Sequence, residues 1–183
     1  MADLSVLAAA IALPFVAAVF TPLLYRLLGE RVGYVGAAVA AISFSLLLTQ
    51  IGADGTVSVP WIPSMDVAVR LTVDAFGLLF ALLASGIGIL VFAYATPYMH
   101  GKPDLGRFYM ALLAFMGSIL GVALASDLIL LFLFWELTSV CSFVLIGYYT
   151  EDDDSQYSAR MAMVLTVGGG LCLLVASLLV AVG

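Results

Sequence analysis

The sequence predicts an all-α integral membrane protein of six transmembrane helices, with a short external β-hairpin between helices 2 and 3. First, 64% of the 183 residues are hydrophobic and 10% are charged, with a mean hydropathy of +1.22, whereas about a quarter of the residues in a soluble domain are charged. Second, apolar runs of about 20 residues, the length that a helix needs to cross a bilayer, recur along the chain. Third, the longest stretch between two runs alternates apolar and polar residues, as strands do.

Glycine, proline and charged residues mark the ends of each apolar run, so the helices can be placed in order. The predicted spans are Leu4–Leu28, Val32–Ile51, Phe76–Tyr98, Phe108–Ala125, Leu128–Tyr149 and Met161–Val182. Residues 1–183 are interpreted as a single transmembrane domain. No basic residue precedes the first run, which favours a retained helix over a secretory signal. Asp127 is predicted to cap the N-terminus of the fifth helix.

The connection between the second and third spans contains the predicted hairpin. Its sequence, GADGTVSVPWIPSMDVAVRLTVDAF, has a proline-rich bend followed by apolar residues at alternate positions. These alternate residues are Val67, Val69, Leu71 and Val73. The pattern predicts a short hairpin lying over the helix ends.

Basic residues are distributed unevenly between the two sides of the predicted bundle. An even number of spans places both termini on one side, where the only basic residue is Arg70. The connections on the other side carry the remaining basic residues, which are Arg26, Arg31, Lys102, Arg107 and Arg160. The positive-inside rule places those connections in the cytoplasm and both termini outside the cell membrane.

Glycines in the fourth and sixth spans predict close approach of helix backbones. Gly117 and Gly121 form a small-xxx-small pair, and Gly168–Gly170 leave the sixth helix without side chains at three successive positions. Packing is the commonest use of such residues in membranes. The alternative for these glycines is an unwound ligand site.

A single acid, Glu136, lies well inside a span, in the segment LILLFLFWELTSVCSF. It is about 12 Å from Leu128 and about 20 Å from Tyr149 at 1.5 Å per residue, deep in a hydrocarbon core about 30 Å thick. A charge at such a depth costs about 2.5 to 3.5 kcal/mol on insertion scales, and ionisable residues there usually mark ion or proton routes. We therefore predict that Glu136 carries protons. The alternative is a permanently protonated Glu136 that only joins helices by hydrogen bonds.

Hydroxyl groups of the same helix are candidates for a polar path. Ser139 and Ser142 follow Glu136 at intervals of three residues, with Thr138 adjacent, so they lie on or beside one helix face. A relay also needs a cation that approaches and withdraws, because burial holds a proton on a carboxylate and a nearby cation releases it. No Lys, Arg or His lies deep within a predicted span. We expect a buried lysine from another polypeptide, or from a stretch outside this sequence.

Other chemistries find no support in the sequence. Cys141 and Cys172 lie in apolar spans and are interpreted as small buried residues, not as a disulfide or metal pair. No cluster of oxygen ligands predicts a metal site, and no cofactor is expected. Nothing in a chain of net charge −6 is basic enough to hold nucleic acid. The expected partners are the lipid bilayer and other membrane subunits.

Three motifs downstream of Val59 are specific in combination: RFY at 107–109, SD at 126–127 and FWELTS at 134–139. Together with LTVDAFGLLFALLASGIGILVFAYATPYM and MAMVLTVGGGLCLL, they closely resemble the amino-terminal part of the A subunit of Mrp-type multi-subunit Na+/H+ antiporters. The wider superfamily includes the antiporter-like subunits of respiratory complex I and of membrane-bound hydrogenases.

The resemblance implies that Glu136 is the family's fifth-helix glutamate, which pairs with a lysine on a discontinuous seventh helix during proton translocation. The implied function is that of one component in a monovalent-cation/proton antiporter, a transporter without covalent chemistry. The alternatives are the equivalent subunit of a redox-driven proton pump and a non-conducting assembly scaffold. Family members continue through many more helices, so we expect either a second polypeptide that completes the subunit or a truncated product.

Overall fold

A mostly helical fold with one small antiparallel sheet appears in the computed structural model, which describes residues 3–62 and 67–182. The elements in order are α1 (Leu4–Leu28), the 3-10 turn η1 (Gly29–Arg31), α2 (Val32–Leu48), β1 (Gly55–Ile62), β2 (Val67–Val73), α3 (Ala75–Tyr98), α4 (Leu105–Leu124), α5 (Leu128–Ile146) and α6 (Asp153–Val182). Each predicted span overlaps one of the α-helices.

The helix boundaries follow local capping chemistry. Asp74 accepts a hydrogen bond from the Gly77 amide at 2.6 Å and so caps α3. The start of α6 differs from the prediction, because this helix begins at Asp153 and not at Met161. Asp153 and Asp154 lie in its first turn, where acidic side chains are favoured by the helix dipole. Their polarity keeps this turn out of an apolar core but does not stop it from being helical.

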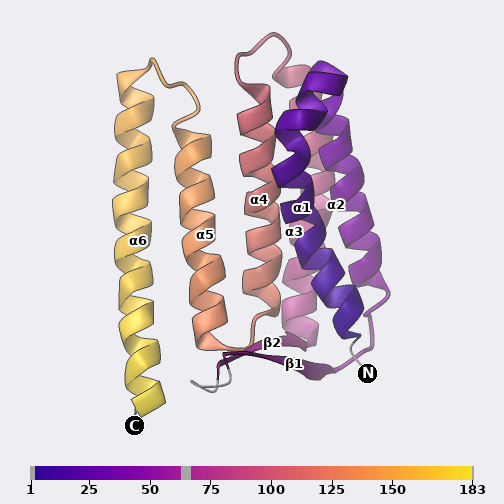
Figure 1. The fold of residues 1–183 in the computed structure, drawn as a ribbon, viewed down its shortest axis with the longest axis vertical. Helices are drawn as coiled ribbons and strands as arrows, with labels where there is room; N and C mark the ends of the chain where they lie inside the picture. The colour runs from indigo at the N-terminus through magenta and orange to yellow at the C-terminus, as the bar shows by residue number, and fades with distance from the viewer. Residues whose placement is uncertain (1–2, 63–66, 183) are drawn as a thin grey trace.

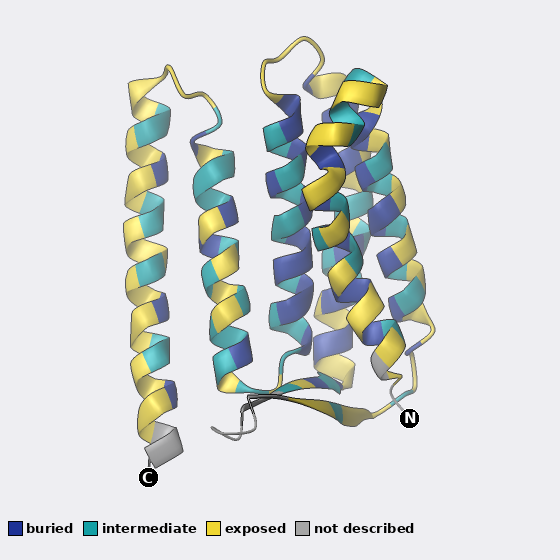
Figure 2. Cartoon of the chain, viewed as in Figure 1, coloured by how far each residue is buried: buried dark blue, intermediate teal, exposed yellow. Residues whose placement is uncertain are grey.

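The helices form a bundle of four with a pair beside it (Figure 1). Within the bundle α1 packs on α2 and α4, α2 packs on α3, and α3 packs on α4. Beyond it, α5 packs on α4, and α6 packs on α5. Both ends of the described chain lie at the same end of the molecule as the hairpin (Figure 1). In Figure 2 the buried residues of α6 lie along its side toward α5, and most of its other described residues are exposed or half-buried.

Glycine and phenylalanine pairs bring neighbouring helices together. A side chain added at Gly36 would meet the ring of Phe92, one at Gly117 would come within 3.0 Å of the ring of Phe15, and one at Gly121 would overlap the ring of Phe134. These pairs join α2 to α3, α1 to α4, and α4 to α5. The predicted packing role of Gly117 and Gly121 is therefore confirmed.

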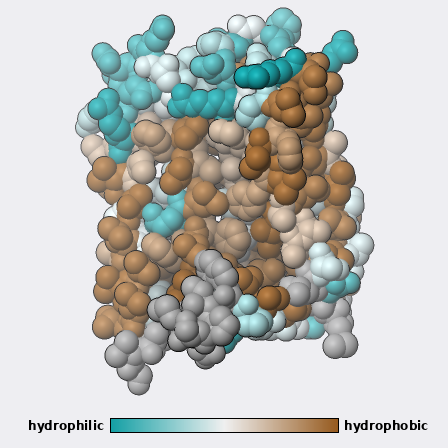
Figure 3. All heavy atoms as spheres, viewed as in Figure 1, coloured by the Kyte–Doolittle hydropathy of each residue, from teal (hydrophilic) through white to brown (hydrophobic). Residues whose placement is uncertain are grey.

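The outer surface is apolar, as expected for helices in lipid. Val19, Phe76 and Leu179 are 73%, 70% and 70% exposed, and soluble monomers rarely expose large contiguous patches of such residues. Within the described ranges, five helical segments are long and apolar enough to cross a membrane, and one of them, the 44-residue segment Ser5–Leu48, runs through α1 and α2. Figure 3 shows a brown apolar belt below a hydrophilic upper end. The chain is therefore a multi-pass membrane protein.

The predicted hairpin is present and lies across one end of the bundle. β1 and β2 pair in antiparallel register from Gly55 with Val73 to Ile62 with Val67. Leu71 and Val73 are 4% and 1% exposed and belong to the core cluster at this end. The Ser126 amide donates a hydrogen bond of 3.0 Å to the Arg70 carbonyl, so the strand also holds the connection that leads into α5.

Candidate functional site

The position of Glu136 along α5 is set by the cap at the start of the helix. Asp127 accepts hydrogen bonds from the amides of Ile129 at 2.9 Å and Leu130 at 3.2 Å, which confirms the predicted cap. Counted from Leu128 at 1.5 Å per residue, Glu136 lies about 12 Å along a helix of about 28 Å. The carboxylate is therefore near the middle of α5.

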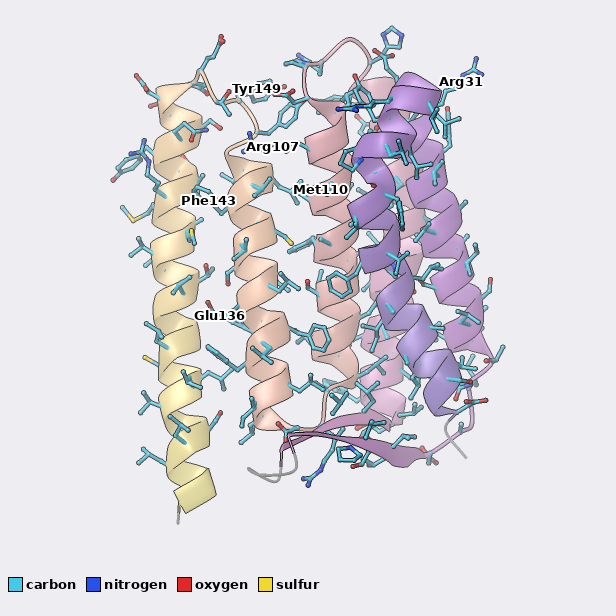
Figure 4. All side chains as sticks on the ribbon, viewed as in Figure 1. Arg31, Arg107, Met110, Glu136, Phe143 and Tyr149 are labelled. Carbon is cyan, nitrogen blue, oxygen red and sulfur yellow. The ribbon has the colours of Figure 1, made fainter. Side chains whose placement is uncertain are left out.

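The direction in which Glu136 points follows from the packing of Phe134. The Phe134 ring lies on Gly121 of α4 and stacks on Phe15 of α1, with ring centroids 6.3 Å apart. Residues two positions apart in an α-helix, such as Phe134 and Glu136, are separated by about 200° around the helix axis. Since Phe134 faces α4, Glu136 must face away from the four-helix bundle, toward α6. Figure 4 shows Glu136 on this side of α5.

The Glu136 carboxyl group lies directly against Gly170 of α6. A Cβ atom built on Gly170 would overlap Oε1 of Glu136 and lie 2.9 Å from its Cδ. Glu136 is half-buried as a residue, but its Oε1 atom is inaccessible and has no hydrogen-bond partner among the described residues. The site is thus a carboxyl oxygen enclosed between two helices.

Two of the three hydroxyl groups predicted to accompany Glu136 donate to a backbone carbonyl of their own helix. Thr138 donates to the Trp135 carbonyl at 2.6 Å, and the buried Ser139 donates to the same carbonyl at 3.3 Å. Ser142 is half-buried. Neither of the two donated bonds reaches Glu136, and the described part of the chain provides no partner for its Oε1 atom. The proposed polar path along α5 therefore stays a prediction.

The basic side chains other than Arg70 lie toward the end of the molecule opposite the hairpin, away from Glu136. Nε2 of His100 lies 3.0 Å from a carboxylate oxygen of Glu30, and the Lys102 ammonium group lies 5.7 Å from the centroid of the Tyr149 ring. Figure 4 places Arg31, Arg107 and Tyr149 at this end and Glu136 much lower. Among the described residues there is no group of His, Cys, Asp and Glu side chains that could hold a metal ion.

Two features of the interior were missed in the sequence. Gly170 was grouped with Gly168 and Gly169, although it alone of the three is buried. Tyr109 of the RFY motif is 1% exposed. A Cβ atom built on Gly33 would lie 2.7 Å from its hydroxyl oxygen. That hydroxyl has no partner within the geometric limits for a hydrogen bond among the described residues. An isolated tyrosine in an apolar run is the only signal that the sequence offered for it.

Two segments of the chain match the sequence models of known families. Residues 61–109 match the family described as NADH-Ubiquinone oxidoreductase (complex I), chain 5 N-terminus, and residues 125–182 match NADH:quinone oxidoreductase/Mrp antiporter, TM. In these two segments the chain is similar to membrane proteins of complex I and of Mrp antiporters.

Two relatives from Staphylococcus aureus indicate which of these membrane proteins the chain resembles in sequence. The A1 subunit of a Na(+)/H(+) antiporter of Staphylococcus aureus is 40% identical over 185 residues, which cover 98% of this chain and 23% of that protein. A protein named as antiporter subunit mnhA2 of S. aureus strain MRSA252 is 43% identical over 156 residues, covering 82% of this chain and 20% of that protein. This chain is thus similar to the amino-terminal part of the A subunit of Mrp-type Na+/H+ antiporters, and it spans about a fifth of the length of these relatives.

Solved structures agree with this similarity. The Mrp complex from Dietzia sp. DQ12-45-1b contains a chain with a TM-score of 0.86 and 36% identity, with 96% of this chain and 19% of that one covered. The membrane-bound sulfane sulfur reductase, an archaeal respiratory membrane complex, contains a chain with a TM-score of 0.78 and 19% identity, with 93% of this chain and 27% of that one covered. The second likeness concerns the fold alone.

Proposed function

We propose that this chain is a membrane segment of a multi-subunit Na+/H+ antiporter and contributes part of a proton pathway through Glu136. The chain then works as a transporter component without covalent chemistry. The observation that carries the proposal is the carboxyl oxygen of Glu136, enclosed between α5 and α6 without a hydrogen-bond partner among the described residues. The similarity to the A subunit of Mrp-type antiporters supplies the kind of complex.

The missing hydrogen bond favours a proton carrier over a structural link. A glutamate that only joined helices would gain its stabilisation from a hydrogen bond across the interface. Buried polar atoms are normally hydrogen-bonded, and an exception calls for a functional reason. The Oε1 atom of Glu136 touches the α6 backbone at Gly170 without bonding any described residue. No described residue therefore holds this oxygen in a hydrogen bond, which leaves the carboxyl group free to exchange its proton with a group from another part of the complex.

A buried lysine from another part of the complex would complete the relay. In a low-dielectric interior a carboxylate keeps its proton until a cation comes near, so a lysine that approaches and withdraws would drive release and uptake. The basic side chains of this chain lie in its connections or within about two turns of a helix end, as Lys102 and Arg107 do. We propose that the lysine belongs to a neighbouring membrane segment.

The proposed topology has six spans. The chain reverses direction at η1, so α1 and α2 count as two separate spans. At 1.5 Å per residue α1 is about 37 Å long and α2 about 25 Å, and each is close to the thickness of the hydrocarbon core, about 30 Å. Most of the basic residues lie in or beside the connections opposite the hairpin, and by the positive-inside rule we propose that these connections face the cytoplasm. Both termini and the hairpin then lie outside the cell membrane.

The test is proton movement driven by an imposed Na+ gradient in vesicles that contain the whole complex. Glu136→Gln keeps the shape of the side chain but cannot titrate, so proton movement should fall to the background rate while the complex still assembles. Glu136→Asp keeps the carboxyl group but shortens the side chain by about 1.5 Å, so partial activity is expected because proton transfer depends on hydrogen-bond reach. Wild-type transport by a well-assembled Gln variant would leave the scaffold alternative standing.

A redox-driven proton pump is the second candidate, supported by the family match that complex I and Mrp antiporters share. The identity levels favour the antiporter, at 40% to an antiporter subunit against 19% to a chain of the archaeal respiratory complex. Co-purification with iron–sulfur or quinone-binding subunits would instead support the pump.

A further inference from the structure

The contact between Gly170 and Glu136 joins the proposed proton carrier to a helix that carries no charge near it. We propose that Gly170 is a positioning residue, which holds the Glu136 carboxyl group against the α6 backbone at the place where proton transfer occurs. This inference rests on the proposed role of Glu136.

The atoms at this contact leave no room for a side chain on Gly170. A Cβ atom there would occupy the place of Oε1 of Glu136 and lie 2.9 Å from its Cδ. Its next neighbour, Cδ1 of Trp135, is at an ordinary contact distance of 3.5 Å. An alanine at position 170 would therefore displace the carboxyl group, which is the end of a flexible side chain, and would leave the helix packing in place.

The two preceding glycines provide matched controls. Gly168 and Gly169 are exposed, and a Cβ atom on either one would have no neighbouring atom within 4 Å. Alanine at these positions adds the same methyl group to the same helix and raises helix propensity in the same way. Any effect that is specific to Gly170→Ala must therefore come from the contact with Glu136.

Moving the carboxyl group should change transport more than assembly. Displacement of a reacting group by about 1 Å can cost up to about 100-fold in rate. We expect Gly170→Ala to lower Na+-driven proton movement by about tenfold and to change its dependence on pH, because the displaced group meets a different environment. Gly168→Ala and Gly169→Ala should keep the wild-type rate and pH profile.

The experiment measures proton movement in vesicles containing the whole complex, at a series of pH values, together with the amount of assembled complex. A second variant combines Gly170→Ala with Glu136→Asp, which withdraws the carboxyl group by one carbon–carbon bond, about 1.5 Å, and makes room for the methyl group. If Gly170 acts by positioning Glu136, Gly170→Ala should cost little or nothing in the Glu136→Asp background. If Gly170→Ala alone lowers the amount of assembled complex, that loss should also be small or absent in the Glu136→Asp background.

The outcomes separate this inference from the proposed function. Equal rates and pH profiles for Gly170→Ala and Gly169→Ala would overturn the positioning role, and so would an undiminished loss in the Glu136→Asp background. Either result leaves the proton-carrying role of Glu136 intact as long as Glu136→Gln abolishes transport. Wild-type transport by Glu136→Gln would instead overturn the proposed function, and the positioning role with it.

Discussion

Replacing Gly121 by alanine should loosen the contact between α4 and α5, on which the direction of Glu136 depends. A Cβ atom there would lie 2.6 Å from Cδ2 of Phe134 and closer still to two other ring atoms. Carbon atoms pack best at about 3.5 to 4.0 Å, so the ring would have to move by about 1 Å. Phe15 stacks on the Phe134 ring at 6.3 Å and limits this movement.

The magnitude follows from two opposing effects. Overpacking of a filled interior costs about 1 to 3 kcal/mol, whereas alanine gains up to about 1 kcal/mol over glycine in a helix interior. The net loss is therefore about 0 to 3 kcal/mol, so the variant needs a reference. Gly168→Ala provides the reference, because it has the same gain in propensity and no neighbour within 4 Å of the added Cβ.

The assay is the thermal stability of the purified complex, measured as the fraction that stays intact in size-exclusion chromatography after heating. Gly121→Ala should have a lower midpoint temperature than Gly168→Ala. Adding Phe134→Leu should recover part of the difference, since the smaller side chain leaves space for the methyl group. Equal midpoints for the two glycine variants would refute the packing argument.

Further predictions concern topology, capping and assembly. Asp54→Cys should react with a membrane-impermeant thiol reagent from outside and Glu151→Cys from the cytoplasm, and the reverse pattern would invert the proposed orientation. Asp127→Ala should destabilise α5 by about 1 kcal/mol and Asp127→Asn by much less, measured by the same heating assay, because asparagine also caps helices. The chain should co-purify with other apolar subunits and show no Na+/H+ exchange alone in liposomes, so exchange by the isolated chain would contradict the need for partners.

Much of the fold could be predicted because the membrane constrains it. Apolar runs of the right length, interrupted by Gly29 and the Asp127 cap, located the helices, and the alternation through Leu71 and Val73 located the hairpin. The start of α6 was placed too late because the prediction followed hydropathy. A helix continues beyond the apolar core when its first turn carries residues such as Asp153 that suit a helix N-terminus.

The surroundings of Glu136 were less predictable than its existence. Depth within an apolar run identified the carboxylate, but its neighbours depend on how α5 and α6 rotate against each other, which no local pattern records. Spacing placed Ser139 near the carboxylate, yet its hydroxyl donates to the Trp135 carbonyl. Side-chain hydroxyls in helices commonly bond to a carbonyl in the preceding turn, and spacing alone cannot decide between such a bond and a contact with Glu136.

In the proposed function Glu136 gains and loses a proton within the membrane. Infrared difference spectroscopy of the whole complex, recorded between high and low pH, tests this most directly because a protonated carboxyl group has a separate carbonyl band. Beside the band of the other acidic residues, we expect one carboxyl component that appears on acidification in the wild type and in Gly169→Ala, is altered in Gly170→Ala and is absent in Glu136→Gln. An identical band in the wild type and the Glu136→Gln variant would show that Glu136 does not titrate and would contradict its role in proton transport.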